Sequence, residues 1–222
     1  MRLMTALRRF ISDPHLGDAK VSALRGYAST DDHDQAFIDA WHRSINSDSI
    51  QVHVLGDISK GGLEAENRAL MILKSLPGIK HLVPGNHCRV HPMHSSARTR
   101  MRTTMGVFSS VMVSDQANIQ GRQIMLSHFP YRGDHEHTGE RYVQWRLRDE
   151  GLWLVHGHVH DEWKINGHQI NVGWEMWPET FATENDILAI IRETELRENQ
   201  AKSAAVAAQH RVARASGLLL PG

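Results

Sequence analysis

The 222-residue chain has little cysteine, no excess of charge of either sign and no long apolar run. Its one cysteine excludes a disulfide within the chain, which is typical of reducing compartments. Lys plus Arg and Asp plus Glu number 25 each, so the formal net charge is zero. The composition therefore has no excess of basic residues that would indicate binding to a nucleic-acid duplex or an anionic membrane. No apolar segment approaches the roughly 20 residues that span a bilayer, and no secretion signal is visible. We therefore expect a cytoplasmic protein.

The order of the apolar segments predicts an α/β fold. Short apolar runs alternate with stretches in which apolar residues recur at helical spacing. Strands are expected at residues 9–12, 51–55, 80–83, 124–126 and 153–155, and helices at 37–45, 63–76 and 140–151. Hairpins are expected at 119–124 and 162–172, because Gln120-Gly121 and Asn166-Gly167 favour tight turns.

The last part of the chain differs in composition. Residues 199–215 are rich in Ala, Gln and Arg, which favour a helix but supply few core-sized side chains. We expect a single domain over residues 1–198, followed by a peripheral helical or disordered tail over 199–222. Within that tail, residues 216–222 are expected to be disordered.

Histidine is the residue that the chain has in excess, with 16 copies. Five of these lie with two Asp and one Asn where expected strands end: Asp13, His15, Asp57, Asn86, His87, His128, His158 and His160. Successive clusters are 44, 29, 42 and 30 residues apart, counted from Asp13 to His158, which fits consecutive βα units. Because open α/β sheets bind ligands beyond the carboxyl ends of their strands, we expect these side chains to meet. Carboxylate, amide and imidazole without thiolate suit a first-row divalent metal.

Each cluster by itself has a simpler explanation. Asp13-Pro14-His15 alone reads as a turn, and Gly56-Asp57 alone is a common boundary between a strand and a loop. The ordered set of five clusters at five strand ends is what indicates a metal site.

The ordered motifs D-x-H, G-D, G-N-H, H and G-H-x-H resemble the calcineurin-like metallophosphoesterase superfamily over about residues 10–177. The flanking residues, such as Ile58-Ser59 and Phe129-Pro130, are similar to the small bacteriophage and bacterial phosphodiesterase-like branch. The resemblance implies a four-layer α/β/β/α sandwich of two mixed β-sheets flanked by helices. It also implies a hydrolase with a binuclear metal centre, with manganese favoured and Fe, Zn, Co or Ni as alternatives.

The same resemblance implies a role for each motif residue. Asp13, His15 and His160 would hold one metal, Asn86, His128 and His158 would hold the second, and Asp57 would bridge both. A metal-bridging hydroxide would attack phosphorus, while His87 would give a proton to the leaving group. In the loop that follows His128, Arg132 and His135 are the candidate substrate contacts. Glu136 and His137, in the same loop, are further candidates.

Some positions depart from the superfamily pattern. Cys88 stands where members often have an acidic residue. This difference concerns the residues around the expected metal ligands and not the ligands themselves. The Asp-Arg pair of protein Ser/Thr phosphatases and the ligand Tyr of purple acid phosphatases are both missing after Asp57. These two subfamilies are therefore disfavoured.

The resemblance makes a phosphodiesterase that hydrolyses small or cyclic nucleotide-type diesters our first prediction. A phosphomonoesterase, a dinucleoside polyphosphate hydrolase and a nuclease are alternatives with the same fold. A non-catalytic binding module is a second competing class, but the motif set is complete and includes His87. A non-enzymatic histidine-rich metal protein is a third class, but it would not require the Asp and Asn residues at the strand ends. We expect a small phosphodiester or nucleotide as the partner and no membrane, and the oligomeric state stays open.

Overall fold

The computed structural model describes residues 7–135 and 138–215. These residues group into two compact units, one that ends at Glu184 and one that begins at Asn185. Helix α5 (Glu184–Ala215) supplies the second unit, and the boundary expected after residue 198 falls inside this helix. The expected disorder of 216–222 concerns residues outside the described part. No helix of the described residues is long and apolar enough to cross a membrane.

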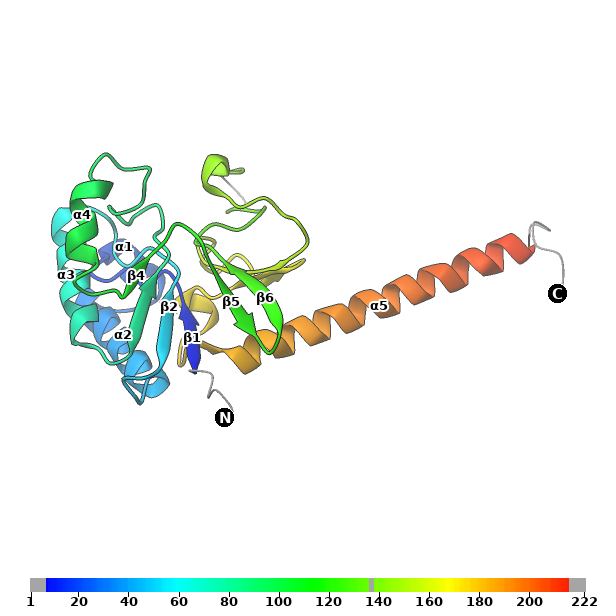
Figure 1. The fold of residues 1–222 in the computed structure, drawn as a ribbon, viewed down its shortest axis with the longest axis horizontal. Coiled ribbons are helices and arrows are strands. Elements are labelled where there is room, and N and C mark those ends of the chain that lie inside the picture. The colour runs from blue at the N-terminus through cyan, green and yellow to red at the C-terminus, as the bar shows by residue number, and fades with distance from the viewer. Residues whose placement is uncertain (1–6, 136–137, 216–222) are drawn as a thin grey trace. The chain divides into compact units, whose positions relative to one another are not determined.

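The first unit begins with alternating strands and helices (Figure 1). They are β1 (Arg8–Ile11), α1 (Ala19–Leu24), α2 (Thr30–Ser44), β2 (Gln51–Val54), α3 (Leu63–Ser75), β3 (Ile79–Leu82), α4 (Ala97–Thr104) and β4 (Ser110–Val111). Strands β1 to β4 are parallel neighbours in one sheet, and β10 (Ala182–Thr183) adds an antiparallel edge to β1. Because consecutive parallel strands need crossovers, the helices lie between them in sequence.

A second sheet contains the remaining five strands, in the order β5-β6-β7-β9-β8. Its elements are β5 (Asp115–Ile119), β6 (Arg122–Leu126), the short 3₁₀ helix η1 (Val143–Trp145), β7 (Trp153–His156), β8 (Ile165–Asn166), β9 (Gln169–Asn171) and the 3₁₀ helix η2 (Trp174–Met176). The inner strands β6, β7 and β9 are parallel, whereas β5 and β8 are antiparallel to their neighbours. The predicted fold class, two mixed β-sheets with flanking helices, is therefore confirmed.

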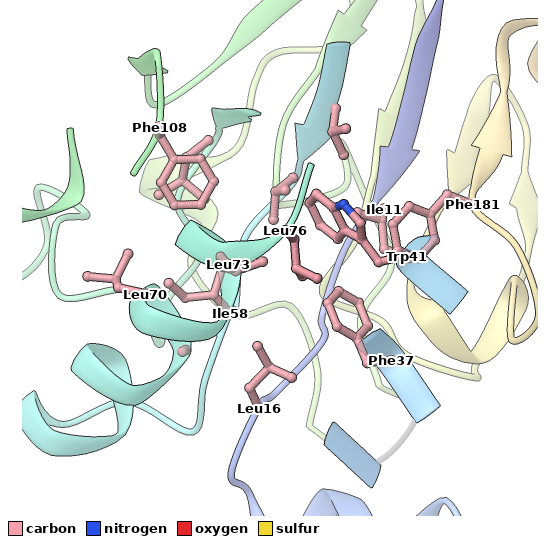
Figure 2. Packing of buried hydrophobic residues seen from close by; sticks show 14 of the residues in the cluster. Ile11, Leu16, Phe37, Trp41, Ile58, Leu70, Leu73, Leu76, Phe108 and Phe181 are labelled. Atoms are coloured by element: carbon pink, nitrogen blue, oxygen red, sulfur yellow. The ribbon is translucent and has the colours of Figure 1, made fainter. Parts of the chain in front are cut away.

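Helices α2 and α3 bury their apolar faces against the first sheet (Figure 2). Phe37 and Trp41 are four residues apart on α2, so they lie on one face and meet Phe181 with ring centroids 5.6 and 5.4 Å away. Leu73 of α3 and Ile11 of β1 belong to the same buried cluster. Burying each such side chain contributes roughly 1.5–3 kcal/mol, so this cluster fixes the strands whose ends carry the motif residues.

The expected helix over 140–151 is wrong, because only the 3₁₀ turn η1 forms there. Tyr142 has a left-handed backbone with φ of 56°, which an α-helix does not accommodate. Arg146 turns back and donates hydrogen bonds to the carbonyl oxygens of Gly133 and Arg141, at 2.9 Å each. Contacts with a distant part of the loop therefore replace the helical pattern.

Both expected hairpins form. Ile119 pairs with Arg122 around Gln120-Gly121, as predicted. In the second hairpin Asn166 pairs with Gln169, so the turn lies at Gly167-His168, one residue later than expected.

His53 of β2 is a buried titratable side chain within the fold. It stacks on Phe10 and His81 with ring centroids 5.4 and 5.1 Å apart, and neither ring nitrogen has a hydrogen-bond partner. A carboxylate oxygen of Asp115 lies 3.9 Å from its Nδ1. Burial, helped by the positive charges of His81 and Arg8, lowers the pKa of His53 to about 3. The folded protein therefore keeps this ring neutral over much of the acidic range.

We expect His53 to make the protein sensitive to mild acid. Below about pH 6.5 the unfolded chain binds a proton at His53 that the folded chain does not bind, so stability falls as the pH falls. As the pH falls from 6 to 4, the free energy of unfolding of the parent protein should therefore fall more steeply than that of His53→Leu. The difference in slope should be about 1.4 kcal/mol per pH unit. Urea denaturation at several pH values measures this, with His42→Leu on the exposed side of α2 as the control. Equal pH slopes for the parent and His53→Leu would contradict it.

Candidate metal centre

The strand ends bring the motif residues into two clusters. Asp13, His15 and His160 form the first, and Asp57, His128 and His158 form the second. In each cluster one ligand atom from every residue lies within 4.8 Å of the others. These are ligand types of divalent transition metals, so each cluster could hold an ion.

The centre lies where the two sheets join. Ser12, at the end of β1, donates its backbone N–H to Val172 at 2.9 Å and accepts one from Trp174 at 3.0 Å. The backbone N–H of His158 donates to the Asp13 carboxylate at 2.9 Å, which ties the end of β7 to the end of β1. The ligand residues of both sheets therefore meet at one place.

The backbone is left-handed at most of the clustered residues. Asp13, His15, Asp57, His158 and His160 have φ values of 56°, 48°, 46°, 74° and 48°. Residues with a Cβ rarely adopt this conformation, and each case costs about 1–3 kcal/mol unless its surroundings hold it. Such conformations are typical of functional sites, where an unfavourable backbone conformation is tolerated because it orients the side chains.

Two glycines of the motifs allow the close approach. A Cβ on Gly85 would overlap the Asp57 carboxylate and the His128 ring, and a Cβ on Gly157 would overlap Ser12 and Asp13. At both positions only glycine leaves room for the carboxylate beside it.

Asp57 and His128 form the electrostatic centre of the second cluster, with Oδ2 3.3 Å from Nε2. Burial alone would raise the pKa of Asp57, but the charge and hydrogen bond of His128 outweigh it and hold that pKa below its usual range. Burial alone would lower the pKa of His128, but the Asp57 carboxylate raises it to about 9. A buried carboxylate that holds a proton on its neighbour is a position suited to a cation.

Atoms without partners support the same conclusion for the first cluster. Oδ1 of Asp13 and both ring nitrogens of His15 are buried and have no hydrogen-bond partner. Leaving such groups unsatisfied is costly, and metal ions commonly satisfy them. The donor set therefore fits divalent ions at both clusters.

Asn86 and His87 lie beside the clusters. The side-chain oxygen of Asn86 is 3.3 Å from Nε2 of His128, which places it next to the second cluster. The ring of His87 is 5.3 Å from the ring of His15, and its Nδ1 donates to the carbonyl oxygen of Lys60 at 3.0 Å. Because Nδ1 is used in this way, Nε2 is the nitrogen left for chemistry.

A cavity of about 440 Å³ opens next to the first cluster. Its lining includes His15, His87, His135 and His160, together with residues of α1. This volume lies within the range of small-molecule sites.

The two expected substrate contacts lie differently. His135 has its ring 5.7 Å from that of His160 and 6.1 Å from that of His158, so it lies over both clusters. Arg132 is exposed, and its backbone N–H donates to the side chain of Gln169 at 3.2 Å. Glu136 and His137 lie outside the described residues.

Cys88 is buried in the hydrophobic cluster of the first sheet. Burial, with the nearby charge of Asp57, raises the pKa of its thiol to about 12. The residue therefore stays a neutral thiol and packs as a small apolar side chain.

Two carboxylates of the centre were not among the candidates from sequence. Asp134 and Glu175 approach His158 and His160 from outside the clusters. Burial alone would raise both of their pKa values, but hydrogen bonds from these histidines and neighbouring arginine charges hold Asp134 below its usual range and lower Glu175 to about 2. No local pattern identifies them, because their partners are distant in sequence.

Comparisons with known proteins give two relatives and a fold. The chain is 40% identical over 177 residues to the gene 66 protein of Mycobacterium phage D29, covering 76% of this chain and 87% of that protein. It is 35% identical over 180 residues to the gene 66 protein of Mycobacterium phage L5, covering 76% and 86%. The crystal structure of AQ665, a protein of unknown function from Aquifex aeolicus, matches with a TM-score of 0.63 at 24% identity over 84% of this chain and all of that chain, which shows a shared fold. No family model matches the chain.

We expect divalent ions to stabilise the protein. Binding to the folded state alone adds about 2.7 kcal/mol to the free energy of unfolding when the free ion is at 100 times its Kd. Calorimetric melting of chelator-treated protein, with and without Mn²⁺, measures the gain. Asp57→Asn should lose most of it, whereas Glu64→Gln, on the surface of α3, should keep it. A melting temperature that Mn²⁺ leaves unchanged in the parent protein would refute the metal sites.

Proposed function

We propose that this chain, which belongs to the family of the gene 66 proteins of mycobacteriophages D29 and L5, is a dinuclear-metal-dependent phosphoesterase of the calcineurin-like superfamily. The observation that carries the proposal is the pair of adjacent His/Asp clusters beside a cavity. The ordered motifs of the sequence support it, and so does the two-sheet fold.

The proposed ligands follow the two clusters. Asp13, His15 and His160 would hold one ion, and Asn86, His128 and His158 would hold the other, with Asp57 shared between them. Manganese is the first choice, although imidazole and carboxylate also suit Fe, Zn, Co and Ni. When bound, two such ions supply Lewis acidity for the phosphoryl oxygens and lower the pKa of a water molecule.

His87 is proposed as the general acid. Its backbone N–H donates to Oδ1 of Asp57 at 2.8 Å, which fixes the residue at the edge of the second cluster. Its Nδ1 is held by Lys60, so the proton on Nε2 is the one available to an alcohol leaving group in the cavity. A general acid in such a position contributes typically 10²–10⁴-fold to the rate.

The cavity lining supports a substrate with a low phosphate charge. Asp18, Asp161 and Glu175 line it with Lys20, Arg25 and the proposed acid His87, so the charges on its walls nearly cancel and provide no excess of positive charge. A single diester group brings one negative charge, whereas a monoester brings about 1.5–2 negative charges and a polyphosphate chain brings several in total. Small or cyclic nucleotide-type phosphodiesters are therefore the proposed substrates, and His135 and Arg132 are the proposed contacts to their remaining polar groups.

A substrate panel tests this function. Chelator-treated protein restored with Mn²⁺ is assayed on a phosphomonoester, a linear dinucleotide, 2′,3′- and 3′,5′-cyclic nucleotides, a dinucleoside polyphosphate and duplex DNA. We expect metal-dependent hydrolysis with the highest kcat/KM on a small or cyclic diester. If another substrate of the panel is hydrolysed faster, its chemical class replaces the diester as the proposed substrate. If no substrate of the panel shows metal-dependent hydrolysis, the proposal that the protein is an enzyme is refuted.

The role of His87 gives a sharper test. His87→Gln should keep both metal ions, because His87 belongs to neither cluster. It should lower kcat by about 10²–10⁴-fold on a diester with an alkoxide leaving group, and much less on one with a nitrophenolate leaving group, which needs no proton. Metal analysis and the two rates check this. A lost metal ion, or equal losses on both substrates, would contradict the assignment.

A further inference from the structure

The sequence His158-Val159-His160 provides one histidine to each cluster, although the two residues are almost adjacent. Neither a strand nor a helix fixes their backbone, which is left-handed at both positions. Their rings must therefore be oriented by something outside this turn.

Glu175, the middle residue of η2, orients His160. Its Oε1 accepts a hydrogen bond from Nδ1 of His160 at 2.7 Å, which leaves Nε2 of that ring to face the first cluster. The same carboxylate accepts from Nε and Nη2 of Arg25 at 3.0 and 2.6 Å. Arg25 also donates to the carbonyl oxygens of Asp13 and Pro14, at 2.7 and 3.1 Å. One ion pair thus holds two segments that supply ligands to the first cluster.

Asp134, in the loop after β6, approaches His158 in a similar way. Its Oδ2 lies 3.4 Å from Nε2 of His158, and Nη2 of Arg141 lies 3.5 Å from the same nitrogen. A guanidinium so close disfavours a cation on Nε2, so Nδ1 is the nitrogen left for the second cluster. Asp134 is itself fixed by Arg141 at 2.6 Å and Arg146 at 2.9 Å, and its side chain is 1% exposed.

We infer that Glu175 and Asp134 are positioning residues, each of which sets the ring orientation of one histidine and thereby the affinity of one metal position. The inference rests on the proposed metal centre. Carboxylates behind ligating histidines typically contribute 10–100-fold to metal affinity. Because the two contacts belong to different clusters, each carboxylate should act on its own site and leave the other unchanged.

A crossover experiment tests this selectivity. Chelator-treated His15→Ala keeps the second cluster, and His128→Ala keeps the first, so each background reports on one site. Calorimetric titration with Mn²⁺ gives the affinity of the remaining site. In His15→Ala, Asp134→Asn should weaken binding 10–100-fold and Glu175→Gln should leave it unchanged. In His128→Ala the effects should be reversed.

Matched controls and second variants protect the interpretation. Glu179→Gln and Asp149→Asn change exposed acids outside both clusters and should leave both affinities unchanged. Glu175→Asp and Asp134→Glu keep the charge beside the arginines but alter its reach, so they should show the same crossover if the first variants fold poorly. Losses of equal size in both backgrounds, or no loss in either, would overturn the inference.

This readout is independent of turnover. A crossover in a protein that hydrolyses no phosphoester would refute the proposed function and keep the positioning roles. Metal-dependent phosphoester hydrolysis without the crossover would keep the proposed function and refute the positioning roles.

Discussion

The left-handed turns at the strand ends are the constraint on which the rest of the centre depends. Asp13 and Asp57 leave neighbouring parallel strands in this conformation, and main-chain hydrogen bonds link the two turns. Asp13 N–H donates to Gly56 at 3.2 Å, and His15 N–H donates to Asp57 at 3.0 Å. Each left-handed residue costs about 1–3 kcal/mol, and the pairing of β1 with β2, which continues into these turns, helps to hold them. The apolar cluster beneath β1 and β2 therefore supports the site as well as the fold.

The joint between the two sheets explains why ligands from such distant segments meet. The β1 end carries Asp13 and is bonded through Ser12 to the segment after β9, while the β7 end is bonded to Asp13 itself. Gly157 is required there, because any side chain would overlap Ser12 and Asp13. A change that separates the sheets by even part of an ångström would move His158 and His160 away from Asp13 and Asp57. Close packing at this joint thus sets the precision of the centre.

The sequence permits prediction of the two-sheet fold and of the residues that form the clusters, because both leave local signals. Short apolar runs such as 51–55 end directly in motif residues, and the order of those motifs is informative as a set. The segment 140–151 has an equally helical pattern, yet it is irregular because Arg146 bonds to Asp134 and to Gly133. Glu175 left no signal either, since Arg25, its partner, is 150 residues away. Contacts of this kind arise only when the fold is complete, so propensity and spacing do not reveal them.

The distribution of charge follows from these long-range pairs. Glu175 is matched by Arg25, and Asp134 is matched by Arg141 and Arg146, so the outer carboxylates of the centre are neutralised by the protein itself. Asp13 and Asp57 are then the carboxylates of the clusters that would face bound cations, and the other proposed ligands, imidazoles and an amide, would carry no charge when they bind a metal. Two divalent ions in this setting would keep a net positive charge, which attracts an anionic phosphate group. With the outer carboxylates paired to arginines, the proposed metal charge would not be cancelled by them, and the centre could attract an anion.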